Sequence, residues 1–237
     1  MGLIKYFDKK ISMYTLNNIK ESCKSVEWLS YHIPKTAGTS FRKSLCEAYG
    51  SGAVYGVYVD TNAKEFSKGE LAWIPNKTKL LHGHFYPHKN HSNLFQNAKK
   101  IIWLRDPIKR AWSLLNHTLD VNNNQIVKDY LTKKFLNHDN ISREEMFLEV
   151  LADKNSERFF TRYHKSLANF PKSFFDFVGK TEDYENGIAI LSGLMDKELK
   201  NFNVNVSVNK SSPPTIPSSL LSYFDKEFKI YDKLTQG

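Results

Sequence analysis

The chain has 237 residues, enough for one domain with a substantial core or at most two small ones. Its composition is that of a globular protein, with 41% hydrophobic and 25% charged residues, and no apolar run approaches the roughly 20 residues that span a bilayer. The formal net charge of +9 favours anionic partners, among them phosphorylated nucleotides, acidic glycans, nucleic acid and anionic membranes, without selecting one.

Residues 1–25 form a polar, weakly patterned lead-in without a charged-then-apolar leader, so we expect a cytoplasmic protein whose single domain covers 26–237. Short apolar runs then predict strands at 26–33, 53–59, 79–85, 100–105 and 174–179. Helical periodicity predicts helices at 40–49, from 107 to 119, at 143–152, 182–195 and 219–234. The clearest loops are 120–125 and 211–219. Strands that alternate with helices indicate an α/β fold with a parallel sheet, which binds ligands at the carboxyl ends of its strands.

The loop PKTAGTS, residues 34–40, joins the first predicted strand to the first predicted helix. The free N–H groups and the dipole of a helix N-terminus favour an anion. Gly38 allows close approach of the backbone, Lys35 adds positive charge, and Thr39 and Ser40 can cap the helix or bind an oxygen. In the P-loop of nucleotide-binding proteins the lysine follows the second glycine, whereas Lys35 precedes Gly38. The loop is therefore either an anion site of another kind or a capped turn with a surface lysine.

Arg105 closes the strand predicted at 100–105, and Ser113 follows eight residues later in the next helix. A guanidinium and a hydroxyl can together bind phosphate oxygens. Asp106 is interpreted as the N-cap of this helix and Pro107 as its first residue, although an aspartate after an apolar strand could also hold Mg²⁺. The inward stripe of the helix is predicted to be Ile108, Trp112, Leu115 and Leu119.

Four histidines lie within LHGHFYPHKNH: His82, His84, His88 and His91. A metal site is one interpretation, but the segment holds no cysteine or carboxylate and its spacing matches no zinc pattern. His88 and His91 fit exposed or core positions. His82 and His84 are two residues apart at a strand end and therefore lie on the same face.

Three of these motifs, in the same order, resemble those of the PAPS-dependent sulfotransferases, in particular the carbohydrate branch typified by heparan sulfate 2-O-sulfotransferase. HIPKTAGTSF resembles the loop that grips the 5′-phosphosulfate of 3′-phosphoadenosine-5′-phosphosulfate (PAPS), with the lysine assisting the leaving group. Arg105 and Ser113 match the 3′-phosphate motif. The HGH tripeptide resembles the catalytic strand end, which implies that His84 is the base and that His82 supports it. The resemblance implies nucleotide contacts at Lys35, Thr36, Ala37, Gly38, Thr39 and Ser40.

The resemblance extends from about residue 27 to 234. FVGKTEDYENGIAIL (177–191) resembles the late strand–turn–helix of the family. VNKSSPPTIPSSL (208–220) resembles the loop that folds over the nucleotide, which implies that Lys210 and Ser211 contact it. Asn209 stands where the family has arginine and Pro214 where it has a later lysine, so the match to the acidic-substrate contacts and to part of the 3′-phosphate grip is incomplete.

The resemblance implies a fold like that of P-loop nucleotide kinases and transfer of a sulfuryl group from PAPS to a hydroxyl, with a carbohydrate as acceptor. The product is then 3′,5′-ADP, and no metal, nucleic acid or transmembrane segment is expected. Two other functions fit the residues: a P-loop kinase-like phosphotransferase that uses ATP and Mg²⁺, and a non-catalytic polyanion-binding module. Loops at 60–78 and 120–140 are expected to shape the acceptor site.

Overall fold

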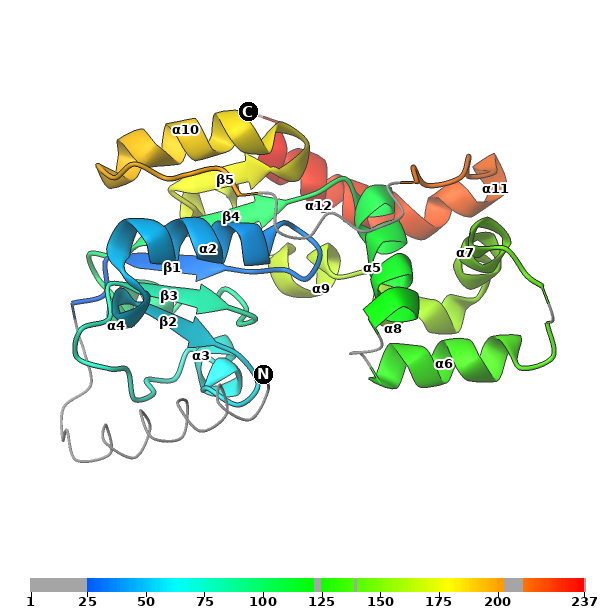
Figure 1. Ribbon diagram of the computed structural model, residues 1–237, viewed down its shortest axis with the longest axis horizontal. Coiled ribbons are helices and arrows are strands. Elements are labelled where there is room, and N and C mark those ends of the chain that lie inside the picture. Colours follow the sequence, from blue (N-terminus) through cyan, green and yellow to red (C-terminus); the bar gives the residue numbers. More distant parts are fainter. Residues whose placement is uncertain (1–24, 122–124, 139, 203–210, 237) are drawn as a thin grey trace.

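A computed structural model describes residues 25–121, 125–138, 140–202 and 211–236. At its centre lies a parallel sheet of five strands in the order β2-β3-β1-β4-β5 (Figure 1). This confirms the predicted α/β fold, and each strand lies within or next to a predicted apolar run. The strands are β1 (Trp28–Tyr31), β2 (Val54–Val57), β3 (Leu80–Gly83), β4 (Lys99–Leu104) and β5 (Phe177–Lys180).

Helices cover both faces of the sheet because successive strand residues point to opposite faces. Trp28 and Ile101 pack on one face with residues of α2 (Gly38–Tyr49) and α10 (Tyr184–Met195). Leu29 and Ile102 pack on the other face. The helices on that second face are α3 (Ala63–Ser67), α9 (Tyr163–Leu167) and α12 (Asp225–Thr235).

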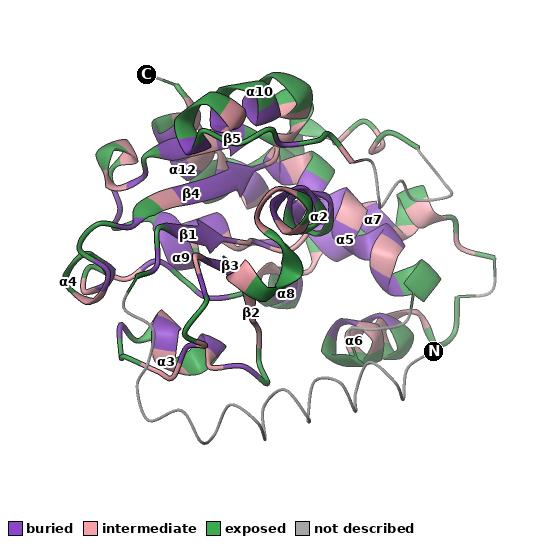
Figure 2. Ribbon diagram, turned by 60° about the vertical axis from the view of Figure 1, so that its left-hand side comes forward, coloured by how far each residue is buried: buried purple, intermediate pink, exposed green. Residues whose placement is uncertain are grey.

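A second group of helices lies beyond the carboxyl ends of the strands and forms a lobe beside the sheet (Figure 1). Its core is apolar and includes Trp112, Leu115, Phe147 and Phe160. Buried residues line the inner sides of α5 and α7, whereas α6 is largely exposed (Figure 2). The helices of this lobe are α5 (Pro107–Val121), α6 (Gln125–Phe135), α7 (Arg143–Ala152), α8 (Glu157–Phe160) and α11 (Ser218–Leu221). A further short helix, α4 (His91–Leu94), lies before β4.

The prediction for 143–152 is confirmed at both ends, since α7 begins after Ser142 and ends at Ala152. Ser142 and Glu145 form a capping box, in which each side chain bonds the backbone N–H of the other residue. The helix predicted at 219–234 is instead interrupted by a 3₁₀ turn at Ser222–Phe224 between α11 and α12.

The predicted stripe of α5 is partly wrong. Leu119 is 37% exposed, whereas the neighbouring Leu114 and Leu115 are buried. The helix turns a broad face toward the lobe, so a single stripe at helical spacing does not describe what it buries. The segments 60–78 and 120–140, expected to be loops, contain α3 and α6. The predicted lead-in falls mostly on residues 1–24, which lie outside the described residues. Among the residues that the structure describes, no helix is long and apolar enough to cross a bilayer.

Candidate functional site

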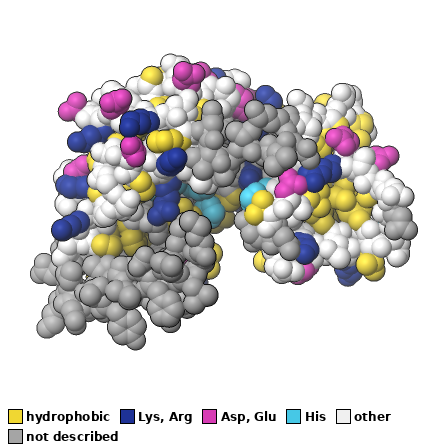
Figure 3. All heavy atoms as spheres, in the orientation of Figure 1, with side chains coloured by type: hydrophobic (Ala, Val, Ile, Leu, Met, Phe, Trp, Pro, Cys, Tyr) yellow, Lys and Arg dark blue, Asp and Glu magenta, His cyan; other side chains and the backbone are white. Residues whose placement is uncertain are grey.

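The predicted site residues follow the carboxyl ends of neighbouring parallel strands. Tyr31, the last residue of β1, pairs with Gly83 of β3 and Ile102 of β4. The segments after these three strands therefore leave the sheet at one edge, which is where open α/β folds bind ligands. Figure 3 shows a hollow at this level between the sheet and the helical lobe, with histidine, lysine and arginine side chains on its wall.

The loop after β1 has an unusual backbone. Lys35 and Ala37 adopt left-handed conformations, with φ of 75° and 60°. Such conformations cost residues other than glycine about 1–2 kcal/mol each, and they gather at functional sites. The buried Thr36 between them donates to the carbonyl of Ile33 at 2.8 Å and so holds the turn. Left-handed residues before a helix turn successive N–H groups toward one point, and this makes an anion-binding concavity.

Gly38 is the first residue of α2, and the ring of His32 packs directly against it. A Cβ at Gly38 would overlap the His32 imidazole. Glycine is therefore required here by the neighbouring ring, in addition to any ligand that approaches the loop. Thr39 is exposed and Ser40 is buried in the first turn of α2.

Lys35 and Arg105 converge on this loop. The Nη1 atom of Arg105 lies 3.5 Å from the carbonyl oxygen of Lys35, to which it donates. Burial, together with the positive charge of Arg105, lowers the pKa of Lys35 to about 8. Neither cation forms an ion pair with any carboxylate among the described residues. Anionic groups of a ligand bound by these two cations would relieve this repulsion.

His82 and His84 lie at the end of β3 as predicted, but their environments differ. His82 is buried, and its Nδ1 lies 2.9 Å from the hydroxyl of Ser30 on β1. Burial lowers the pKa of His82 to about 3, with Arg42 and His84 contributing, so the ring is neutral at physiological pH. His84 is exposed and lies edge-on to Tyr58, with ring centroids 5.0 Å apart.

The pKa of His84 is also lowered, first because the protein displaces water from part of the ring and then by the charge of Arg162. The lowered pKa favours the neutral form of His84 at pH 7, and the residue is exposed at the sheet edge. A neutral, accessible imidazole can accept a proton from a hydroxyl.

His32 is a site residue that sequence reasoning missed. Its ring centroid lies 5.3 Å from that of His82 and 4.6 Å from that of His84, so it occupies the space between the loop and both histidines. Its Nδ1 is buried without a hydrogen-bond partner among the described residues. Burial lowers its pKa well below the ordinary value, and the charges of its neighbours add to this shift. The sequence signal that could have identified His32 as a site residue is its position at the end of a predicted strand, just before the loop.

The other two histidines lie apart from this set. His91 is buried, with its Nδ1 2.9 Å from the Tyr31 hydroxyl and its Nε2 2.7 Å from the Phe66 carbonyl. This confirms the interpretation of His91 as a core residue. His88 is half-buried and accepts from the N–H of Asn90. Within the described ranges, no three histidine, cysteine or carboxylate side chains are grouped to hold a metal ion.

The helix after β4 begins as predicted, because Asp106 Oδ1 accepts from the N–H of Lys109 at 2.9 Å. Ser113 lies half-buried in the second turn of α5. Arg110 of the same helix is completely buried. The carbonyl of Ser211 accepts from the indole N–H of Trp112, the residue before Ser113, at 2.8 Å. Lys210 lies outside the described residues.

Comparison with known families gives one match. A family model described as Sulfotransferase family matches residues 23–233, which include all five strands and every described site residue. A comparison with the curated proteins finds no match.

Proposed function

Since the chain belongs to the sulfotransferase family, we propose that it transfers a sulfuryl group from PAPS to a hydroxyl of a carbohydrate, with His84 as the general base. The single observation that supports this best is that Lys35, His84 and Arg105 follow the carboxyl ends of three adjacent strands. These side chains supply an anion site and a proton acceptor at one edge of the sheet.

The residues fit a nucleotide that carries anionic groups at both its 5′ and 3′ ends. The left-handed loop, the start of α2 and Lys35 suit the 5′-phosphosulfate. Arg105 would hold the 3′-phosphate with Ser113, and the attachment of Ser211 at Trp112 brings the C-terminal segment to the same helix. Lys210 belongs to this proposal by resemblance.

When bound, PAPS supplies a sulfur atom with a good leaving group, and the bond between that sulfur and the phosphate oxygen breaks as the acceptor oxygen bonds to sulfur. His84 takes the proton of the acceptor hydroxyl. Lys35 and the first N–H groups of α2 stabilise the negative charge that develops on the departing oxygen. His82, held by Ser30, is neutral and supports the position of His84.

The test is transfer of labelled sulfate from PAPS to a panel of glycans and small alcohols. His84→Ala should lower turnover at least about 100-fold, as expected for loss of a general base. Its affinity for 3′,5′-ADP should remain within about threefold, since the base does not hold the nucleotide. His88→Ala, four residues away and outside the site, is the control. Turnover retained in His84→Ala would remove His84 as the base.

Ligand-induced shifts of the melting temperature separate the proposal from a kinase-like phosphotransferase. A sulfotransferase should be stabilised by 3′,5′-ADP without metal, whereas a phosphotransferase should prefer ATP with Mg²⁺. A shift with ATP and Mg²⁺ that exceeds the shift with 3′,5′-ADP would contradict the proposal.

A further inference from the structure

One hydroxyl satisfies both backbone groups of Arg105. The Tyr163 hydroxyl donates to the Arg105 carbonyl at 2.6 Å and accepts from the Arg105 N–H at 2.9 Å. Tyr163 belongs to α9, and its side chain is completely buried. Arg105 is the first residue after β4, where the ladder of backbone hydrogen bonds has ended. The direction in which the Arg105 side chain leaves the sheet therefore depends on Tyr163.

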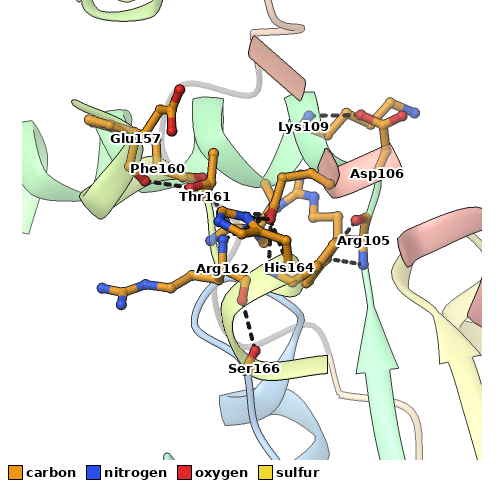
Figure 4. A network of polar contacts seen from close by, with 12 residues as sticks. Arg105, Asp106, Lys109, Glu157, Phe160, Thr161, Arg162, His164 and Ser166 are labelled. Atoms are coloured by element: carbon orange, nitrogen blue, oxygen red, sulfur yellow. Dashed lines mark hydrogen bonds and ion pairs between the residues drawn. The ribbon is translucent and has the colours of Figure 1, made fainter. Parts of the chain in front are cut away.

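Tyr163 is in turn fixed by Glu227, a residue of α12 far away in the sequence. The carboxylate accepts from the backbone N–H groups of Arg162, Tyr163 and His164 at 2.8, 3.0 and 3.0 Å. It also lies 2.9 Å from Nδ1 of His164. Figure 4 shows Arg162 and His164 of this network beside Arg105. The four contacts pin the start of α9 and thereby the position of the Tyr163 ring.

The network contains a buried ion pair between Glu227 and Arg110. Burial alone would raise the pKa of Glu227, but the three backbone donors and the charge of Arg110 lower it below the ordinary value. Nη2 of Arg110 lies 3.9 Å from the carboxylate, and its guanidinium lies over the Tyr163 ring at 5.5 Å from the centroid. A buried ion pair is often no more stabilising than apolar side chains of the same volume. The presence of the ion pair next to Arg105 therefore points to a role in fixing the local geometry around Arg105.

We propose that Tyr163 and Glu227 are positioning residues that aim Arg105 at the 3′-phosphate of the bound nucleotide. The inference rests on the proposed function for the identity of that nucleotide. Neither residue touches the reacting atoms. Sequence patterns carried no sign of them, because the network joins β4, α9 and α12 across separations of 58 and 64 residues.

The sharpest test compares two nucleotides that differ only in the 3′-phosphate. Tyr163→Phe removes the hydroxyl and keeps the ring. It should bind 3′,5′-ADP about tenfold more weakly than the wild type, as expected for lost hydrogen bonds, and should bind 5′-AMP within about twofold. Tyr223→Phe is the matched control, since the Tyr223 hydroxyl bonds Ser156 at 2.7 Å, away from Arg105. Calorimetry gives both dissociation constants for each variant.

A double-mutant cycle identifies the route of the effect. Arg105→Ala should abolish the preference for 3′,5′-ADP over 5′-AMP. Adding Tyr163→Phe to Arg105→Ala should cost nothing further, because the two changes remove the same contact. If Tyr163→Phe weakens both nucleotides equally, or adds its full effect in the Arg105→Ala background, the positioning role is overturned.

Glu227→Gln tests the second residue by amide hydrogen exchange. The Arg105 N–H should exchange at least about tenfold faster, because its hydroxyl partner is no longer held. Unchanged exchange together with unchanged nucleotide preference would remove Glu227 from the proposal. If the glutamine variant does not fold, Glu227→Asp, which keeps the charge but shortens the side chain, gives the same comparison.

Failure of the proposed function looks different from failure of this inference. A wild-type protein without preference for 3′,5′-ADP over 5′-AMP contradicts the proposed nucleotide. A wild-type preference that Arg105→Ala abolishes and Tyr163→Phe leaves intact contradicts the positioning role alone.

Discussion

Alanine at Gly38 should destabilise the protein, although alanine normally stabilises a helix relative to glycine. A Cβ at this position would overlap the imidazole of His32. That ring has little room to move, because the centroids of His82 and His84 lie 5.3 and 4.6 Å away. Overpacking of this kind costs about 1–3 kcal/mol, against a gain of up to about 1 kcal/mol from helix propensity. We expect Gly38→Ala to lower the free energy of unfolding by about 1–2 kcal/mol.

Equilibrium denaturation in urea measures this change, and each kcal/mol should also lower the melting temperature by about 2–4 °C in a chain of this length. Gly193→Ala in α10 is the control, because a Cβ there meets no atom within 4 Å and should be neutral or stabilising. In a His32→Ala background the overlap is gone, so Gly38→Ala should become neutral or stabilising too. The reasoning is refuted if Gly38→Ala matches Gly193→Ala, or if His32→Ala leaves its effect unchanged.

Three further predictions concern stability. The pKa of Lys35 is about 8 in the folded protein, below its ordinary 10.5, so the unfolded chain binds more protons between these values. The free energy of unfolding should therefore rise from about pH 8 to about pH 10.5, and it should rise less steeply in Lys35→Met. Denaturant titrations at several pH values measure this, and an equal dependence on pH in the two proteins would contradict the prediction. Ser142→Ala breaks the capping box with Glu145 and should cost about 1 kcal/mol in urea denaturation without changing nucleotide affinity. Leu115→Ala should cost about 2–5 kcal/mol, whereas Leu119→Ala at the partly exposed position should cost under about 1 kcal/mol, and similar melting temperatures would restore the predicted stripe.

The strands and their carboxyl ends were predictable because buried parallel strands leave continuous apolar runs in the sequence. Lys35, His84 and Arg105 could be placed at one edge of the sheet on that basis alone, since each lies at or just beyond the carboxyl end of such a run. Asp106 was predictable as a cap because capping depends on residues a few positions apart.

Contacts between distant segments were not predictable. Glu227 reads as one polar position of an amphipathic helix, yet it is buried and holds the start of α9. His32 reads as the polar end of a strand until His84 is placed beside it. Likewise, the exposure of Leu119 depends on which helices pack against α5, and periodicity within one helix carries no such information.

The attachment of α9 to Arg105 constrains how this fold can be altered. Helices α5 to α9 form one continuous insertion between β4 and β5, which suggests a module that evolution or an engineer could exchange as a unit. Tyr163 prevents this, because an exchange that includes α9 would also remove the support of Arg105. Chimeras should therefore replace α6 and α7 and retain α9 with its partner in α12. Sequence divergence among related proteins can accumulate in α6 and α7 at little cost to nucleotide binding, so long as α9 and its contact with Arg105 are kept.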